Sequence, residues 1–428
     1  MARRTSSVMV VAAAVCLALA GPVVSAGAVE QGTVEPGAVA QPVAAPPAAD
    51  RVEGPEGAAR MAALRAVTDA GAAAAIAEVR GEGGVWRAGT GVADLATGAP
   101  VRVDGRFRAG SITKVLTSTT VLQLVGEGRL GLDDPIERHL PGVVPDGGRI
   151  TVRQLLNHSS GLWDPTNEPG GLFPHTTDPA VIRDWLDQGG LTRSITPAQV
   201  VAASVAHAPN FPPGAKFSYS NVNYTLLGMI IERVTGHGYA QEITARILRP
   251  LGMTGTYFPG SATDIRGPHA HGYWTLAEGP APEDRSDRDV TVESVTWANS
   301  AGELISTLAD LNRFERALVG GRLLSPQLMR QMTTTIPVEV DGKPSALAYG
   351  LGLARLELSC GPVYGHDGGM PGFSSQLWSS GSRQVAMSVT SRGDEPQAVR
   401  QLAAQGGFLE EAFCGNHQGG GAARPMLR

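Results

Sequence analysis

The sequence predicts an α/β protein of the α+β type, in which an antiparallel sheet is flanked by helices and carries an inserted, mostly helical subdomain. The first observation is a pair of short apolar stretches, residues 74–79 and 85–92, separated by a Gly-rich turn. The second is a set of alternating stretches near the other end of the chain, at 350–358, 363–368, 373–379 and 384–390. The third is the helical spacing of apolar residues between these two sets. Strands from both chain ends should therefore pair in one sheet.

The helices are expected where apolar residues recur every three or four positions. One begins near Ser111 and continues through an uncharged run to Val125. Others are predicted at 152–156, 197–206, 222–234, 239–248 and 307–319, and a last one at 395–413. No internal repeat or second linker divides this region, which favours a single composite domain.

The ends of the chain differ in composition from the middle. An arginine pair precedes an apolar run at residues 8–20, and small residues follow, which is typical of a signal peptide cleaved near Ala26 or Ala28. The next segment is rich in Ala, Pro and Gly and has too few large apolar groups to offset its ordering entropy. We therefore expect an exported, extracellular protein with a signal peptide (1–28), a flexible spacer (29–55), a folded domain (56–415) and a disordered tail (416–428).

The charge balance limits the class of partner. The net charge is −5 at neutral pH, and removal of the signal peptide, which has two arginines and no acid, takes it to −7. An acidic chain is a poor ligand for nucleic acid or an anionic membrane surface. No other apolar run approaches the roughly 18 residues of a membrane-spanning helix, so no stable membrane anchor is expected.

Two cysteines, Cys360 and Cys414, lie outside the signal peptide. An even number in an exported chain favours a disulfide, and two buried free thiols are the alternative. His269 and His271 alternate along the chain, but no third ligand cluster accompanies them. We therefore expect no metal site and no cofactor.

Ser111 and Lys114 are the first candidates for chemistry. They stand three positions apart at the start of a predicted helix, so their side chains share one helix face. This places a hydroxyl nucleophile beside an amine that can act as its base. Only three of the 35 Lys and Arg residues are lysines, and Lys can lose its proton near neutral pH whereas Arg cannot.

Two further motifs carry polar groups of the kind that assist a nucleophile. Tyr219-Ser-Asn221 precedes an apolar helix and offers a phenol and an amide in one loop, although a helix N-cap with a packing tyrosine is the alternative. His366-Asp-Gly-Gly369 lies in a predicted strand, where glycines let a substrate backbone approach closely. A tight turn with an exposed histidine is the alternative for this motif.

Together the three motifs resemble those of the serine β-lactamase and penicillin-binding protein superfamily. The chain is most similar to secreted D-alanyl-D-alanine carboxypeptidases related to class C β-lactamases, over roughly residues 60–415. The similarity extends to Leu155–Leu162, to Trp297–Gly302 and to the late cysteine pair. It implies a β-lactamase/transpeptidase-like fold and a disulfide between Cys360 and Cys414.

The resemblance also implies a role for each motif residue. Ser111 matches the nucleophile that forms an acyl-enzyme, Lys114 the amine beside it, and Tyr219 the phenol that moves protons. Asn221 matches the amide that orients the lysine and the substrate, and His366 the cationic or polar group of the third motif. The resemblance further implies an oxyanion hole formed by the backbone N–H groups of Ser111 and Gly369, and substrate contacts from Trp297, Asp367 and Gly368.

The third motif departs from the carboxypeptidase pattern. Asp367 stands where many carboxypeptidases have Thr or Ser, and an acid there should repel a substrate carboxylate and favour a free amine. The basic residue that usually precedes this motif has no certain counterpart, although Arg355 is nearby. His158 is interpreted as a structural residue under the site. Whether Lys114 or Tyr219 is the base stays open.

The leading functional prediction is a serine-type D-alanyl-D-alanine carboxypeptidase or transpeptidase. Within the enzyme class, a class C-like β-lactamase, a D-aminopeptidase and an esterase are alternatives. A penicillin-binding sensor without turnover is the alternative from a different class. The expected partners are a peptide or a β-lactam-like small molecule, with cell-wall peptidoglycan as a candidate source.

Overall fold

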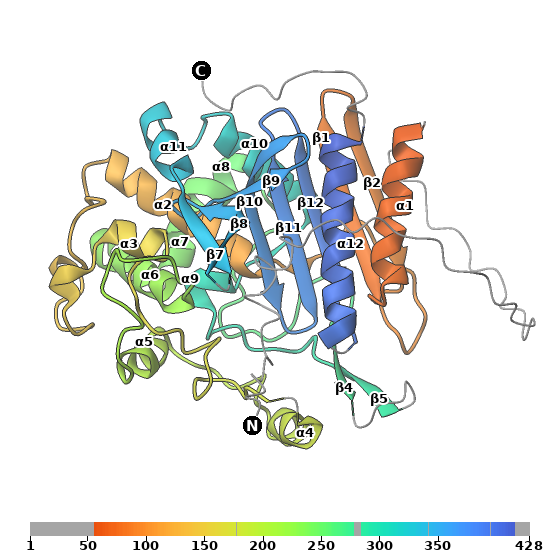
Figure 1. Ribbon diagram of the computed structural model, residues 1–428, viewed down its shortest axis with the longest axis horizontal. Helices are drawn as coiled ribbons and strands as arrows, with labels where there is room; N and C mark the ends of the chain where they lie inside the picture. The colour runs from red at the N-terminus through yellow and green to blue at the C-terminus, as the bar shows by residue number, and fades with distance from the viewer. Residues whose placement is uncertain (1–54, 177, 278–283, 341, 394, 416–428) are drawn as a thin grey trace, which may run out of the picture.

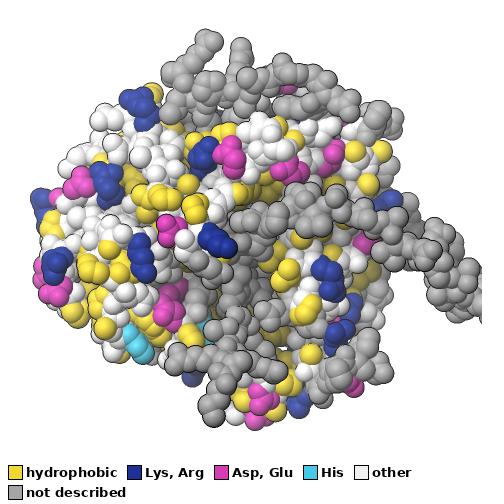
Figure 2. Space-filling model, in the orientation of Figure 1, with side chains coloured by type: hydrophobic (Ala, Val, Ile, Leu, Met, Phe, Trp, Pro, Cys, Tyr) yellow, Lys and Arg dark blue, Asp and Glu magenta, His cyan; other side chains and the backbone are white. Residues whose placement is uncertain are grey.

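A computed structural model describes residues 55–176, 178–277, 284–340, 342–393 and 395–415. The predicted signal peptide, nearly all of the predicted spacer and the predicted tail lie outside the described residues. Figure 1 shows a central sheet with two helices packed on one face and most of the other helices on the opposite side. In Figure 2, basic and acidic side chains are interspersed over the visible part of the surface that is drawn in colour.

The sheet has eight strands, and every neighbouring pair is antiparallel. The first β-hairpin joins the last strand through a ladder that pairs Ala74 with Thr390, so the two ends of the domain meet in the sheet. The predicted α+β fold class is therefore confirmed. The strand order is β2 (Gly84–Gly91), β1 (Ala74–Gly81), β12 (Gln384–Thr390), β11 (Phe373–Ser379), β10 (Gly361–Met370), β9 (Ala354–Leu358), β8 (Lys343–Tyr349) and β7 (Ile336–Val340).

The two faces of the sheet bury different side chains because residues alternate along a strand. On β12, Val385 and Met387 pack with residues of α1 (Pro55–Asp69) and α12 (Glu395–Cys414). Ala386 between them faces the other core, which contains α10 (Leu308–Val319) and the helical subdomain. A shift of one residue in register would exchange these two sets, so the two-sided burial fixes the pairing.

The inserted subdomain lies between β2 and β7 in the sequence. Its central helix α2 (Thr113–Gly126) is buried over most of its surface, as expected for a helix with apolar residues on all sides. Its other helices are α3 (Val152–Leu156), α4 (Pro179–Asp187), α5 (Pro197–Val205), α6 (Asn221–Thr235), α7 (Tyr239–Ile243), α8 (Arg249–Leu251), α9 (Asn299–Gly302) and α11 (Pro326–Thr333). It also contains the short helical turns η2 (Gly110–Ile112), η3 (Ile136–Arg138) and η4 (Gly147–Arg149), and the π-helical segment η5 (Thr244–Leu248). Two small strand pairs are β3 (Phe107–Arg108) with β6 (Ile305–Ser306) and β4 (Tyr273–Ala277) with β5 (Arg285–Asp289).

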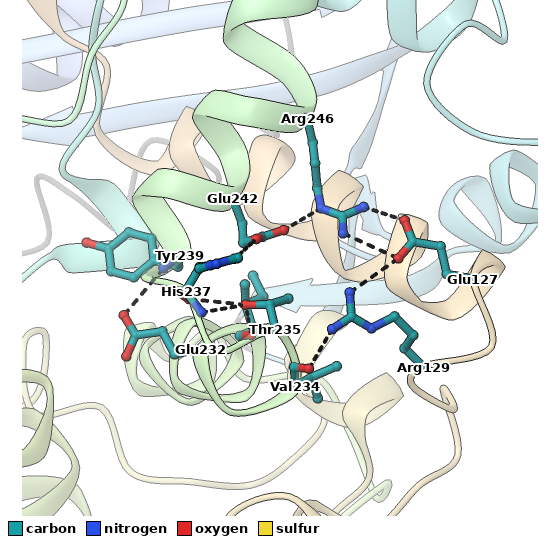
Figure 3. Close-up of polar contacts among 10 residues, drawn as sticks. Glu127, Arg129, Glu232, Val234, Thr235, His237, Tyr239, Glu242 and Arg246 are labelled. Carbon is teal, nitrogen blue, oxygen red and sulfur yellow. Dashed lines mark hydrogen bonds and ion pairs between the residues drawn. The ribbon is translucent and has the colours of Figure 1, made fainter.

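The end of α2 that lies far from Ser111 is held by a polar network (Figure 3). Arg246 of η5 forms ion pairs with Glu127 and, at 2.6 Å, with Glu242. Arg129 donates from Nη2 to the Val234 carbonyl at 2.7 Å, which adds the end of α6 to the network. These contacts hold α6 and η5 to the helix that carries Lys114.

The predicted strand at 350–358 is wrong in its first half. The structure ends β8 at Tyr349 and begins β9 at Ala354, with a turn in which the Gly350 N–H donates to the Leu353 carbonyl at 2.8 Å. Gly352 has a φ of +81°, and a Cβ there would lie 1.9 Å from Ser118 Oγ on α2. The glycines therefore bring this turn against α2 and interrupt the strand.

A disulfide joins Cys360, in the turn between β9 and β10, to Cys414 at the end of α12, with the Cα atoms 5.5 Å apart. Arg383 reinforces this end of α12 by donating to the Ala412 carbonyl at 2.7 Å. Among the described residues, no helix is both long enough and apolar enough to cross a membrane.

Candidate active site

Ser111 lies in the η2 turn that leads into α2. All other residues from Phe107 to Leu122 are buried, so Ser111 is the one position of this run that a substrate can reach. Its Oγ lies 2.9 Å from Lys114 Nζ, one turn along the helix, as the three-residue spacing predicts.

Lys114 is fully buried and has three polar neighbours. Its Nζ lies 2.9 Å from Ser111 Oγ, 2.7 Å from Asn221 Oδ1 and 2.8 Å from the Ala301 carbonyl. The last two are obligatory acceptors, whereas the serine hydroxyl can accept or donate. An ammonium can therefore donate to all three groups, and a neutral amine can instead accept the serine proton.

Tyr219 lies two residues before the start of α6 and contacts the same serine oxygen. Its hydroxyl lies 2.9 Å from Ser111 Oγ, and Lys114 Nζ lies 4.9 Å from the centre of its ring. Two titratable groups thus contact one nucleophile candidate, and each lies close enough to exchange a proton with it. The geometry is compatible with either group as the base.

Asn221 begins α6 and connects Lys114 to a loop that the sequence analysis did not single out. Its Nδ2 donates to Thr166 Oγ1 at 2.8 Å and, less closely, to Asp164 Oδ2 at 3.4 Å. Burial raises the pKa of Asp164, while hydrogen bonds from Thr166 and Asn167 oppose this shift. The only sequence signal for this loop is its position directly after the Leu155–Leu162 stretch.

His158 lies under the site, as the sequence interpretation proposed. It is fully buried, and its ring stacks on that of Tyr219. Its Nδ1 is 3.2 Å from the Ser220 amide nitrogen, which must donate, so Nδ1 is the acceptor. Burial and the nearby Lys114 hold the pKa of His158 well below its ordinary value, so the ring is neutral near pH 7.

The η2 turn and β10 approach each other closely because two glycines leave room. A Cβ at Gly110 would lie 2.8 Å from the nitrogen of Gly369, and one at Gly368 would lie 2.1 Å from the Ala109 carbonyl oxygen. Gly110 also has a φ of +54°, a region that favours glycine. The close approach brings the backbone of Ser111 beside that of Gly369.

The second half of β10 has one open edge. Its ladder with β9 covers Gly361–Gly365, whereas its ladder with β11 continues to Met370. Met370 and Phe373 flank a two-residue turn and form the hydrogen-bonded pair of that hairpin, so Gly369 belongs to the next, non-hydrogen-bonded pair. The Gly369 N–H therefore points away from β11, toward the open edge beside Ser111.

His366 is buried on β10 and is engaged on both ring nitrogens. Nε2 lies 2.7 Å from the Tyr349 hydroxyl, and Nδ1 contacts the Asp367 carbonyl. Burial lowers the pKa of His366, against the opposing effect of Asp367, so the ring is a neutral polar group rather than a cation near pH 7. Arg355 of β9 forms an ion pair with Glu357 at 2.5 Å.

Asp367 is 4% exposed and lies opposite Gln376 in the β10–β11 ladder. Residues directly opposite one another share a face of the sheet. Gln376 donates to Gln405 of α12 at 3.2 Å, so the register places Asp367 on the face that α12 covers. Its carboxyl group also lies 3.7 Å from His366 Nδ1, so the third motif has an acidic side chain beside its histidine.

Trp297 is half-buried and precedes α9, whose Ala301 carbonyl contacts Lys114. Its ring packs edge-on against Phe173 with centroids 4.8 Å apart, and its Nε1 lies 3.4 Å from Glu293 Oε1. Burial raises the pKa of Glu293 to about 8, although Arg108 opposes the shift. Within the described residues, no group of three or more His, Cys, Asp or Glu side chains is arranged to hold a metal ion.

A serine that contacts a buried lysine and a tyrosine, at a helix start beside an antiparallel sheet, defines a serine hydrolase of the β-lactamase and penicillin-binding type. The sequence model of the Beta-lactamase family matches residues 60–410, and the chain belongs to this family.

Known relatives have several activities. Penicillin-binding protein 4 of Amycolatopsis lactamdurans is 31% identical over 327 residues, 73% of this chain and 79% of that protein. The D-stereospecific amidohydrolase of a Streptomyces species is 37% identical, with a TM-score of 0.71 over 84% of this chain and 99% of that one. The D-amino acid amidase of Ochrobactrum anthropi SV3, solved with L-phenylalanine amide, is 27% identical, with a TM-score of 0.69 over 83% and 98% of the two chains.

Proposed function

We propose that this protein hydrolyses amides of D-amino acids through an acyl-enzyme on Ser111. The observation that carries the proposal is the position of Ser111 Oγ, which lies 2.9 Å from both Lys114 Nζ and the Tyr219 hydroxyl. Either neighbour can take the serine proton as Oγ attacks the substrate carbonyl.

The rest of the reaction follows from the same groups. The N–H groups of Ser111 and Gly369 stabilise the tetrahedral oxyanion, each contributing about 3–4 kcal/mol. Tyr219 donates a proton to the leaving nitrogen as the C–N bond breaks. A water molecule then attacks the acyl carbon and gives a proton to the Lys114–Tyr219 pair, and Ser111 Oγ leaves with a proton.

The third motif favours an amide over a peptide with a free carboxylate. His366 is neutral near pH 7, its two nitrogens are engaged within the protein, and Asp367 places an acid beside it. The side chains of the third motif therefore offer no positive charge to a C-terminal carboxylate. The similarity to two D-amide hydrolases supports the same substrate class.

The experiment is a matched substrate set with mass-spectrometric detection of the acyl-enzyme. D-Phenylalanine amide and L-phenylalanine amide test stereochemistry, and an acyl-D-Ala-D-Ala peptide with a free or an amidated C-terminus tests the carboxylate. We expect turnover of the D-amide, and Ser111→Ala should abolish it. Faster cleavage of the free-carboxylate peptide than of its amidated form would contradict the proposal.

A D-alanyl-D-alanine carboxypeptidase is the second candidate, because penicillin-binding protein 4 is among the relatives. A cephalosporin and an acetyl ester in the same set test the β-lactamase and esterase alternatives. Acylation without deacylation for every substrate would favour the penicillin-binding sensor. We also propose that the protein is exported, which the disulfide supports; N-terminal sequencing of the mature protein tests cleavage near Ala26 or Ala28.

A further inference from the structure

A chain of buried polar side chains leads from Lys114 away from the substrate side of the site. Lys114 Nζ lies 2.7 Å from Asn221 Oδ1, Asn221 Nδ2 lies 2.8 Å from Thr166 Oγ1, and Thr166 Oγ1 lies 2.7 Å from Asp164 Oδ1. The four side chains are between 0% and 9% exposed. Their hydrogen bonds therefore have little competition from water.

The Asp164 carboxylate at the far end fixes which group donates and which accepts in each of these hydrogen bonds. Asp164 also accepts from the Thr166 N–H at 3.0 Å and from Asn167 Nδ2 at 2.6 Å, and both of these groups can only donate. An ionised Asp164 satisfies them, and the hydrogen bonds from Thr166 and Asn167 favour this ionised form against the effect of burial, which raises its pKa. In this form Asp164 has no proton to give to Thr166. The Thr166 hydroxyl must then donate to Asp164, which leaves only its lone pairs for Asn221.

We infer that Asp164 is a positioning residue that, through Thr166, turns the Asn221 carboxamide so that its oxygen faces Lys114. With the amide reversed, its NH₂ group would face an amine that already donates to the Ala301 carbonyl at 2.8 Å. Lys114 would lose an acceptor and its fixed place beside Ser111. The carboxylate also supplies a counter-charge three hydrogen bonds away from the lysine. This role rests on the proposed function of Ser111 and Lys114.

The first test uses substitutions that remove the fixed donor-to-acceptor order of these hydrogen bonds and then reverse it. Asp164→Asn should slow acylation of Ser111 roughly tenfold to a hundredfold, because the hydroxyl and the amide can then turn either way. Asn221→Asp alone should also be slow, because it adds a second carboxylate where Asn221 Nδ2 now lies 3.4 Å from Asp164. In the double variant Asp164→Asn/Asn221→Asp, the new carboxylate accepts from both Lys114 and Thr166, and the net charge is unchanged.

We expect the double variant to be acylated faster than either single variant. A destabilised loop without a directional role would not give this rescue. Single-variant effects that simply multiply, or a wild-type rate in Asp164→Asn, would overturn the proposal. If Asp164→Asn does not fold, Thr166→Val should slow acylation and Thr166→Ser should restore it, and equal rates in these two variants would also overturn it.

Asp310→Asn is the matched control. Asp310 is 4% exposed and, like Asp164, accepts from a backbone N–H, that of Gly255 at 2.8 Å, and from a threonine hydroxyl, that of Thr256 at 2.9 Å. This substitution should lower the melting temperature without changing acylation. The probe is a fluorophosphonate, with mass measurement of the labelled peptide. No label on wild-type Ser111 would overturn the proposed function together with this role, whereas a labelled wild type lets the variants test the role alone.

Discussion

The imidazole of His158 lies against the ring of Tyr219, with centroids 4.2 Å apart and an angle of 30° between the planes. Nδ1 of the same imidazole accepts from the Ser220 N–H at 3.2 Å, and Asn223 Nδ2 lies 3.1 Å from it. One side chain therefore fixes both the phenol ring and the backbone that follows it. Because the low pKa of His158 keeps it neutral near pH 7, it adds no charge beside Lys114.

His158→Phe should keep the stacking contact and lose the hydrogen-bond acceptor. We expect the free energy of unfolding to fall by about 1–3 kcal/mol, because the buried Ser220 N–H is left without a partner. His158→Ala removes the ring as well and should slow acylation more than His158→Phe does. Urea unfolding and acylation rates measure the two effects, and equal acylation in both variants would show that the ring does not position Tyr219.

Gly110→Ala should separate the two backbone N–H groups of the proposed oxyanion hole. The added Cβ would lie 2.8 Å from the nitrogen and the oxygen of Gly369, so one of the two segments must move. Loss of one oxyanion donor costs roughly a hundredfold to a thousandfold in rate. Gly98→Ala is the control, because Gly98 has a similar φ of +67° and open space around it. An equal loss of rate in both variants would assign the effect to backbone strain.

The sequence was most informative where local pattern and tertiary environment agree. The strands 373–379 and 384–390 were predicted at their observed bounds because both have turn residues at their ends and alternate between two buried faces. Ser111, Lys114, Tyr219 and Asn221 were predicted as a group, and the structure brings their side chains together. The helical spacing of Ser111 and Lys114 was enough to place this pair on one face.

What the sequence could not predict depends on contacts between distant segments. Asp164 and Thr166 lie in a proline-containing loop. Only the fold brings them behind the Asn221 carboxamide. The helices α1, α4 and α11 were not predicted, and neither were the strands β7 and β8 of the main sheet or the strand pair β4–β5. The neutral state of His366 also depends on its burial, which a Gly-rich strand in the sequence did not indicate.

Glu315 of α10 makes the stability depend on pH. It is fully buried, neither carboxyl oxygen has a hydrogen-bond partner among the described residues, and burial raises its pKa from 4.5 to about 8. Between these two pKa values the folded chain keeps a proton that the unfolded chain releases. The free energy of unfolding therefore falls by about 1.4 kcal/mol for each unit of pH rise between them. Glu315→Gln removes this titration and should gain stability relative to wild type between pH 5 and pH 8. Parallel stability curves for the two proteins would contradict the assignment.

The disulfide should stabilise the fold without taking part in the reaction. Cys360 and Cys414 are 54 residues apart in sequence, and closing such a loop in the unfolded chain is worth roughly 4 kcal/mol. The double variant Cys360→Ser/Cys414→Ser should therefore unfold at a lower urea concentration. Because α12 packs on the face of the sheet opposite to α2, the acylation rate of the folded variant should equal that of wild type. A slower folded variant would indicate that α12 affects the site.

Lys114 and Tyr219 should act on Ser111 as one proton-transfer unit. Each lies 2.9 Å from Ser111 Oγ, and the two are close enough for the charge of one to change the protonation of the other. Tyr219→Phe should slow acylation by at least roughly a hundredfold, and Lys114→Met by a similar or larger factor.

Groups that act as a unit give non-additive losses, so the double variant Lys114→Met/Tyr219→Phe should be no slower than the slower single variant. Acylation followed by mass spectrometry over seconds to hours measures all three rates. Multiplied losses would indicate two independent contributions, and a wild-type rate in Tyr219→Phe would remove Tyr219 from the mechanism. Because Lys114 also contacts Asn221 and Ala301, the folded fraction of each Lys114→Met variant is measured by urea unfolding before the rates are compared.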